Sequence, residues 1–178
     1  MANLIVALLT TAGVITAVVT LLHGALAPQG ELSDSWKSMR THSAEMVQTE
    51  MSALGISVTS GGQDLELTVR NDGQTPLREF DKWDLIVAYD PSSTSTGLRL
   101  VRLSYTEDGP PGADHWTIGG IYLDATGPDA EVFGLGVADP GEEFVVQAKL
   151  GVPIGSPSAN AVTLAATNGV TVSSQFAN

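Results

Sequence analysis

The three histidines are the side chains of this sequence best suited to acid–base catalysis, and they lie far apart in the chain. His23 falls in an uncharged stretch, His42 in a polar one, and His115 directly follows Asp114. Nucleophilic catalysis needs a nucleophile, a base and a group that orients the base, all within hydrogen-bond reach. Residues adjacent in sequence do not orient their side chains in this way, and the chain has no Gly-x-Ser-x-Gly, phosphate-loop or zinc-site spacing. The sequence therefore predicts a protein that is not an enzyme.

Carboxylates gather in three short segments, where they form either calcium ligands or an acidic, solvated surface. The three groups are Glu79, Asp81 and Asp84; Asp124 and Asp129; and Asp139, Glu142 and Glu143. Calcium binds several oxygen ligands, but none of these groups has the spacing of a known calcium loop. We therefore predict no cofactor, with surface calcium as the alternative. The net charge of −12 argues against binding to nucleic acid, because the chain lacks a basic patch to neutralise phosphates.

The elements that carry these residues begin with an apolar N-terminal stretch. Residues 1–27 contain no Asp, Glu, Lys or Arg. At about 1.5 Å per residue, a helix over residues 2–27 is roughly 39 Å long, and about 20 apolar residues already span a bilayer. We expect this segment to be helical, because a helix satisfies its own backbone hydrogen bonds in lipid.

Three interpretations of residues 1–27 remain open. A secretory signal peptide is the least favoured, since the stretch lacks a basic start and is longer than the usual apolar part of a signal. The others are a membrane anchor and a helix that sits first in the membrane and later in a protein assembly, which composition does not separate. The stretch begins at the first residue with no positive charge before it. We therefore expect a cleaved leader, with Met1 as the mature start.

A second, amphipathic helix is predicted over residues 31–53. Apolar residues recur there every three or four positions, while Pro28 before it predicts a kink or local unwinding and Gly55 after it a stop. Trp36 and Met39 lie on the apolar face of this helix. They either pack on the sheet of the domain that follows or contact a neighbouring subunit, because exposed apolar stripes usually mark an interface. Residues 1–55 are thus assigned to an N-terminal polymerisation helix.

Residues 56–178 are predicted to form a β domain, the head. Apolar and polar residues alternate along short segments, with turn residues such as Asn71-Asp72-Gly73 between them. The segments are 65–69, 82–89, 97–105, 115–123, 130–135, 143–151, 161–166 and 170–176. Asn168-Gly169, between the last two, is a strong hairpin signal. The pattern is typical of an antiparallel sandwich, so the expected fold class is α+β, a long N-terminal helix kinked near Pro28 and followed by a β-sandwich.

Three stretches carry a resemblance to a known family. They are LIVALLTTAGVITAVVTLL over residues 4–22, DLELTVRNDGQTPL over 64–77 and NGVTVSSQF over 168–176. Together with the order of helix, amphipathic extension and sandwich, they resemble the type IV pilin superfamily. Within it the chain looks most like archaellin, the major filament protein of the archaeal motility filament. Bacterial type IV pilins usually carry a glutamate at the fifth mature position, whereas this chain has Ile5, which fits archaellin better.

The resemblance implies an immunoglobulin-like sandwich and a role as the major structural subunit of an archaellum. It further implies a prepilin-type peptidase that removes a leader and a membrane assembly motor. The expected location is the cytoplasmic membrane before assembly and an extracellular filament afterwards. Two alternatives are a membrane-anchored accessory or stator protein of the archaellum and an adhesive type IV pilin.

The assembly mechanism that we infer is the transfer of the apolar helix from lipid into a core of identical helices. This route avoids exposing the helix to water, which costs about 25 cal/mol per Å². Head-to-tail contacts that do not close into a ring build a helical homo-oligomer, with the heads outside. The predicted polymerisation interface consists of Leu4, Ile5, Leu8, Leu9, Ala12, Gly13, Val14, Ile15, Val18, Val19, Leu21, Leu22, Trp36 and Met39.

Overall fold

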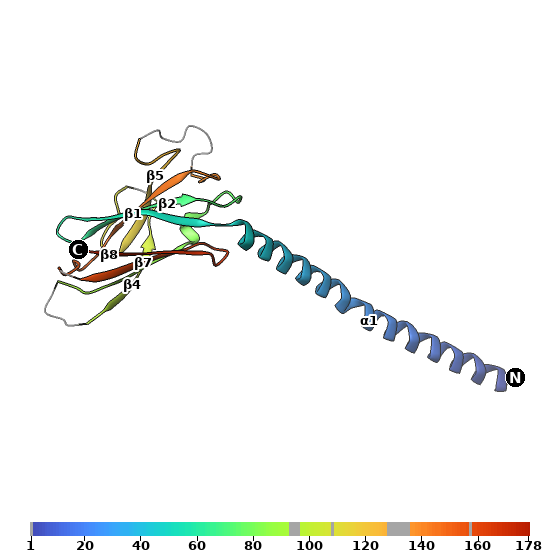
Figure 1. Ribbon diagram of the computed structural model, residues 1–178. Coiled ribbons are helices and arrows are strands. Elements are labelled where there is room, and N and C mark those ends of the chain that lie inside the picture. Colours follow the sequence, from blue (N-terminus) through green and yellow to red (C-terminus); the bar gives the residue numbers. More distant parts are fainter. Residues whose placement is uncertain (1, 93–96, 108, 128–135, 157) are drawn as a thin grey trace. The chain divides into compact units, whose positions relative to one another are not determined.

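The computed structural model describes residues 2–92, 97–107, 109–127, 136–156 and 158–178, with the backbone alone for residues 2 and 22–32. The chain divides into two compact units, Met1–Ala44 and Glu45–Asn178. Every strand and the whole hydrophobic core that the structure describes belong to the second unit (Figure 1).

One long helix, α1 (Ala2–Gln48), runs unbroken in Figure 1 through the N-terminal unit and into the first residues of the second. The predicted helix is therefore confirmed, but the local unwinding at Pro28 and the separate second helix are wrong. A proline in a helix interior removes one backbone hydrogen bond and costs about 3 kcal/mol. We attribute the continuity of α1 to the long segments on either side of Pro28, which keep their own helical hydrogen bonds.

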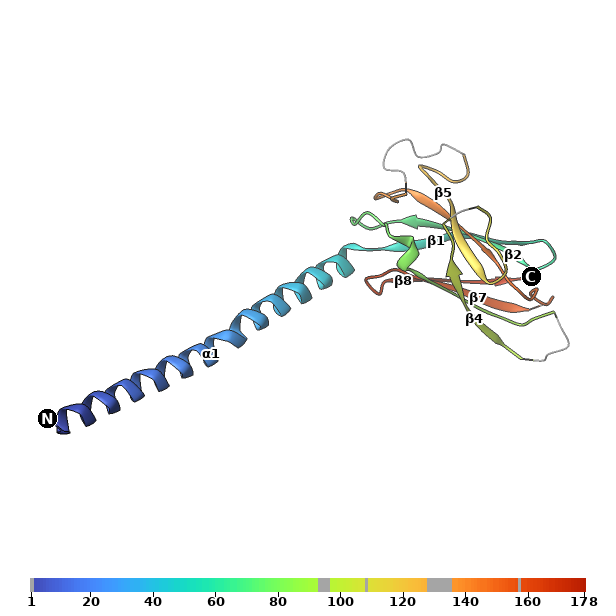
Figure 2. The ribbon, with the colours of Figure 1, turned by 180° about the vertical axis from the view of Figure 1, so that it is seen from behind.

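Eight strands form two layers in the described part of the second unit (Figures 1 and 2). The strands are β1 (Met51–Thr59), β2 (Asp64–Asn71), β3 (Asp84–Tyr89), β4 (Arg99–Tyr105), β5 (His115–Tyr122), β6 (Glu143–Lys149), β7 (Ala159–Ala165) and β8 (Thr171–Ala177). They pair in the order β1-β2-β6-β5-β4-β3-β7-β8. The first four make one layer and the last four the other, while β1 and β8 at the two ends of this order contact each other.

The predicted α+β fold with a sandwich is confirmed, with one exception in strand direction. Neighbouring strands are antiparallel except β4 and β5, which pair in parallel at Ser104–His115 and Tyr105–Trp116. This short parallel pairing joins the two layers. The strand predicted over 130–135 lies outside the described residues.

The first strand begins at Met51, so the predicted continuation of the helix to residue 53 is wrong. Met51 and Ala53 pack against the core, and so do Ile56 and Val58 further along the strand. A bulge between Ala53 and Gly55 shifts the alternation by one residue, which conceals the two-residue period from the sequence. Gly55, which was expected to stop a helix, lies instead in this bulge.

The core fills the space between the layers and uses the alternate residues of each strand. Leu65 and Val69 of β2 are buried there, as the alternating pattern predicts. An aromatic group closes one part of the core: the ring centroid of Phe80, in a short 3-10 helix over Phe80–Lys82, lies 5.0 Å from that of Trp83 and 5.4 Å from that of Phe144. The head therefore has a core of its own, built without cysteine.

Candidate assembly surface

The apolar part of α1 is the largest exposed hydrophobic surface that the structure describes. The segment Asn3–Leu21 is long and apolar enough to cross a membrane. Every predicted interface residue with a described side chain is exposed in the single chain, including Leu9 at 64% and Trp36 at 65%. The side chain of Leu22 lies outside the described residues. Fully burying one large apolar side chain gains about 1.5–3 kcal/mol, so this surface favours lipid or protein over water.

Threonine hydroxyls interrupt the apolar surface, but each of them is satisfied within the helix. The hydroxyl of Thr11 donates to the carbonyl of Ala7 at 2.8 Å, and that of Thr16 donates to the carbonyl of Ala12 at 2.8 Å. Thr10 and Thr20 bond to carbonyls one turn earlier in the same way. Burying a hydroxyl costs free energy only when it lacks a partner. These threonines are therefore compatible with a water-free environment.

The end of the helix is bound by a turn that follows β2. The backbone N–H of Gln74 donates to the carbonyl of Gln48 at 2.7 Å, which satisfies a carbonyl left free at the helix end. The N–H groups of Asp72 and Gly73 both donate to the carbonyl of Glu50, at 3.0 and 3.1 Å. We call residues Gln48–Glu50 the exit segment, because the chain leaves the helix there and enters the sheet.

A second turn, between β7 and β8, binds the same exit segment. The side-chain amide of Asn168 donates to the hydroxyl of Thr49 at 2.8 Å, and this hydroxyl donates to the carbonyl of Glu45 at 2.7 Å. Thr49 is buried. The sequence identified both turns by their Asn and Gly residues, but it did not reveal their common target. The signal available was that both lie within the stretches that carry the family resemblance.

Replacing Gly73 by alanine should disturb this junction. A Cβ atom at that position would lie 2.5 Å from the carbonyl oxygen of Gln48 and 2.6 Å from the backbone nitrogen of Glu50. Overpacking against backbone typically costs about 1–3 kcal/mol, and we expect faster proteolysis near residues 48–51. Gly127→Ala is the matched control, because a Cβ there would have no neighbour within 4 Å. Equal proteolysis of the two variants would contradict the assigned role of the turn.

Asp114 and His115, the adjacent acid and histidine of the sequence, are each engaged in structural hydrogen bonds. His115 Nδ1 lies 2.8 Å from the carbonyl oxygen of Ala113, and Asp114 Oδ1 accepts the backbone N–H of Gly151 at 2.8 Å. The side chain of His42 is exposed, and that of His23 lies outside the described residues. Asp114 and His115 thus bond to separate backbone groups and do not form a dyad.

The acidic groups are likewise divided among separate partners. Glu79 pairs with Lys82, whose hydrogen bond and charge lower the pKa of Glu79. Hydrogen bonds from Thr126 lower the pKa of Asp124. Asp129 lies outside the described residues. In the part of the chain that the structure describes, no three His, Cys, Asp or Glu side chains come together as metal ligands.

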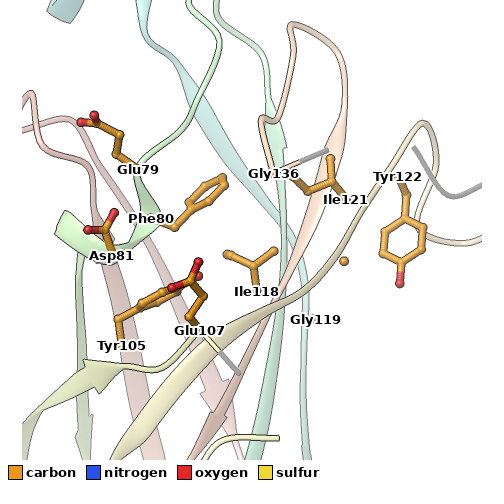
Figure 3. A pocket seen from close by; sticks show the side chains of 11 residues that line it. Glu79, Phe80, Asp81, Tyr105, Glu107, Ile118, Gly119, Ile121, Tyr122 and Gly136 are labelled. Atoms are coloured by element: carbon orange, nitrogen blue, oxygen red, sulfur yellow. The ribbon is translucent and has the colours of Figure 1, made fainter. Parts of the chain in front are cut away.

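A hollow of about 750 Å³ lies beside β5 and the short 3-10 helix (Figure 3). Phe80, Tyr105 and Ile118 line it, together with the carboxylates of Asp81 and Glu107. Burial raises the pKa of the Tyr105 hydroxyl, and the charges of Glu107 and Asp81 raise it further. The described lining of the hollow is therefore acidic and aromatic.

Comparisons by sequence found no relatives of this chain. No protein-family model matches it, and no curated protein matches it.

Solved structures share its fold at low sequence identity. The archaellum periplasmic stator protein FlaG from Sulfolobus acidocaldarius is 18% identical, with a TM-score of 0.51 over 72% of this chain and 99% of that chain. A chain of the archaellum periplasmic stator protein complex of FlaF and FlaG from Sulfolobus acidocaldarius gives a TM-score of 0.50 at 16% identity, over 72% of this chain and 89% of that one. The archaeal flagellum of Methanospirillum hungatei strain JF1 gives 0.53 at 12% identity, over 99% of this chain and 93% of that one. At these identities the likeness establishes a common fold.

Proposed function

We propose that this chain is the major structural subunit of an archaellum-type filament. The observation that carries the proposal is the exposed, uncharged surface of α1 over residues 3–21, in which the threonine hydroxyls are satisfied internally. Such a helix is suited both to lipid and to a core of identical helices. The likeness to the Methanospirillum flagellum supports this role because it extends over 99% of the chain, the helix included.

The assembly route that we propose combines the contrast between the two units with what the family resemblance implies. A prepilin-type peptidase releases the N-terminus, and the helix waits in the cytoplasmic membrane with the head outside. A membrane motor then transfers the helix into a growing core, where contacts through residues such as Leu9, Gly13 and Val18 replace the contacts with lipid. Small residues let helices approach closely, and a Cβ on Gly13 would meet no atom of its own chain within 4 Å. The mature location is an extracellular filament.

A second candidate function is a membrane-anchored accessory or stator protein of the archaellum. The likeness to FlaG favours it, since FlaG is a periplasmic stator protein and matches 72% of this chain. In this case α1 remains in lipid as a single copy and the sandwich binds an envelope partner. The adhesive pilin has no comparable observation in its favour.

Shearing separates the two candidates in the cells that make this protein. A filament subunit should appear as the main band of the sheared, pelleted fraction, with filaments visible by electron microscopy and the band identified by mass spectrometry. A stator protein should remain with the membrane. Recovery of the chain in the membrane fraction alone, from cells that carry filaments, would refute the filament proposal.

A chain beginning at Glu45 should be soluble and should not polymerise. The described core and strands lie in Glu45–Asn178, and this cut preserves the exit segment and β1. The apolar surface that drives assembly is then absent, and the net charge of −12 keeps the heads apart. Sedimentation velocity should detect monomers at neutral pH. Long fibres from this shortened chain would show that the heads hold the assembly together.

A further inference from the structure

The outer face of the layer β4-β3-β7-β8 carries mostly uncharged side chains, many of them small. Strand pairing places Leu100, Ala88, Ala161 and Gln175 in one row across the four strands. In the next row lie Arg102, Ile86, Thr163 and Ser173. We call the outward side chains of these four strands, with Leu98 just before β4, the neutral sheet face.

Within the four strands the neutral sheet face carries few charges, and Asp90, which is exposed directly after β3, lies at its edge. Arg102 Nε donates to Asp84 Oδ1 at 2.7 Å, so the two charged side chains of this face compensate each other. The outer face of the other layer differs, because it carries the charged side chains of Glu66, Arg70 and Lys149.

The net charge of the chain makes this difference important for contacts between copies. Residues 1–44 hold two acidic and two basic side chains, so residues 45–178 carry the whole net charge of −12. Acidic heads repel one another wherever unpaired carboxylates meet. The neutral sheet face is a described surface on which two heads can approach with little repulsion, whereas a basic partner would prefer an acidic surface.

The shape of this face also fits a second copy. Leu98 and Leu100 project from it, with 69% and 71% of their surfaces exposed. Leu98 forms part of the wall of a hollow of about 750 Å³, which Ala88, Ala161 and the end of β8 also line. A face with both a projection and a hollow is self-complementary under two-fold symmetry, since each copy inserts its leucines into the hollow of the other.

We propose that the neutral sheet face is a head-to-head contact between two copies of this chain. Four strands about 4.8 Å apart and some seven residues long cover roughly 400 Å², which is about half of what each partner contributes to a standard stable interface. The contact therefore forms when the N-terminal helices hold the heads at high local concentration in a membrane, where two copies can be related by a two-fold axis. Both candidate functions place the chain in a membrane, so the contact does not depend on which of them holds.

Single-cysteine cross-linking tests this contact cleanly, because the chain contains no cysteine. Full-length Leu100→Cys is placed in lipid vesicles at high density and treated with a short bis-maleimide linker. Ser57→Cys is the matched control, since Ser57 is exposed on the outer face of the other layer. We expect about tenfold more cross-linked dimer from Leu100→Cys, because the contact raises the local concentration of one thiol near the other.

A second variant ties the cross-link to the absence of charge. Gln175→Glu keeps the side-chain shape but adds a negative charge to the same row as Leu100. Combined with Leu100→Cys, it should lower the dimer yield about fivefold, because Gln175 lines the hollow that receives the leucines of the other copy, and a charge buried there has no partner. An unchanged yield, or no excess of Leu100→Cys over Ser57→Cys, would overturn the proposal. If the face binds a different protein, vesicles that hold this chain alone will show no excess of cross-linked dimer. Filaments recovered by shearing would still support the proposed function in that case, so the two proposals can fail separately.

Discussion

Leu9→Asp should abolish assembly while leaving the head folded. Leu9 is 64% exposed on α1 and lies within the segment that is long and apolar enough to cross a membrane. A charged side chain at the centre of a membrane helix costs about 2.5–3.5 kcal/mol, and a buried, unpaired charge in a protein core costs at least as much. Since 1.4 kcal/mol is tenfold in an equilibrium constant, about a hundredfold less of the chain should enter the membrane, and the core offers the charge no better environment. Filament mass recovered by shearing and pelleting measures the loss.

Two control variants separate charge from other effects of substitution at Leu9. Leu9→Met keeps the position apolar and should assemble as the unaltered chain does. Ser38→Asp adds the same charge to an exposed position in the polar half of α1, and it should also assemble. Normal filaments from Leu9→Asp would mean that this surface is not buried in the assembly, and the filament proposal would then fail.

Phe144→Ala should destabilise the head by about 3–5 kcal/mol. Phe144 is fully buried, and its ring lies against Phe80 and Trp83, with centroids 5.4 and 6.1 Å away. Truncating a buried phenylalanine removes the transfer free energy of its ring and leaves a cavity between the layers. Urea denaturation of the full chain in a nonionic detergent, followed by tryptophan fluorescence, measures the change because Trp83 and Trp116 lie in the core.

An exposed leucine provides the comparison for Phe144→Ala. Leu123 is 65% exposed, so Leu123→Ala should change the free energy of unfolding by less than about 0.5 kcal/mol. Similar losses from both substitutions would indicate that the aromatic group is not part of the cooperative core.

The fold was predictable wherever a segment kept one hydrophobic pattern, helical or alternating, over its whole length. Residues 1–27 are apolar over their whole length, and the helix was found there. Apolar and polar residues alternate strictly over residues 65–69, which lie in β2, and the apolar ones are buried. The prediction failed where two patterns overlapped. The bulge between Ala53 and Gly55 gives the apolar residues of β1 a spacing that resembles that of a helix. Proline usually interrupts a helix, but α1 continues through Pro28.

The assembly surface was predictable in kind, while its attachment to the head was not. Exposure of the apolar part of α1 follows from composition, because a single chain offers nothing large enough to cover it. The exit segment depends on contacts between residues far apart in sequence, such as Asn168 with Thr49 and Gln74 with Gln48. Sequence patterns report local spacing and carry no information on such pairs. The roles of Trp36 and Met39 in assembly stay predictions.

The exit segment has a mechanical consequence for a fibre that is pulled or turned. Strain arriving along the backbone at Gln48 meets hydrogen bonds from Gln74, Asp72 and Gly73 on one side and from Asn168 on the other. A pulling force that enters at Gln48 must break these bonds before it reaches β1. The first strand should consequently stay in its sheet until the exit segment has come away.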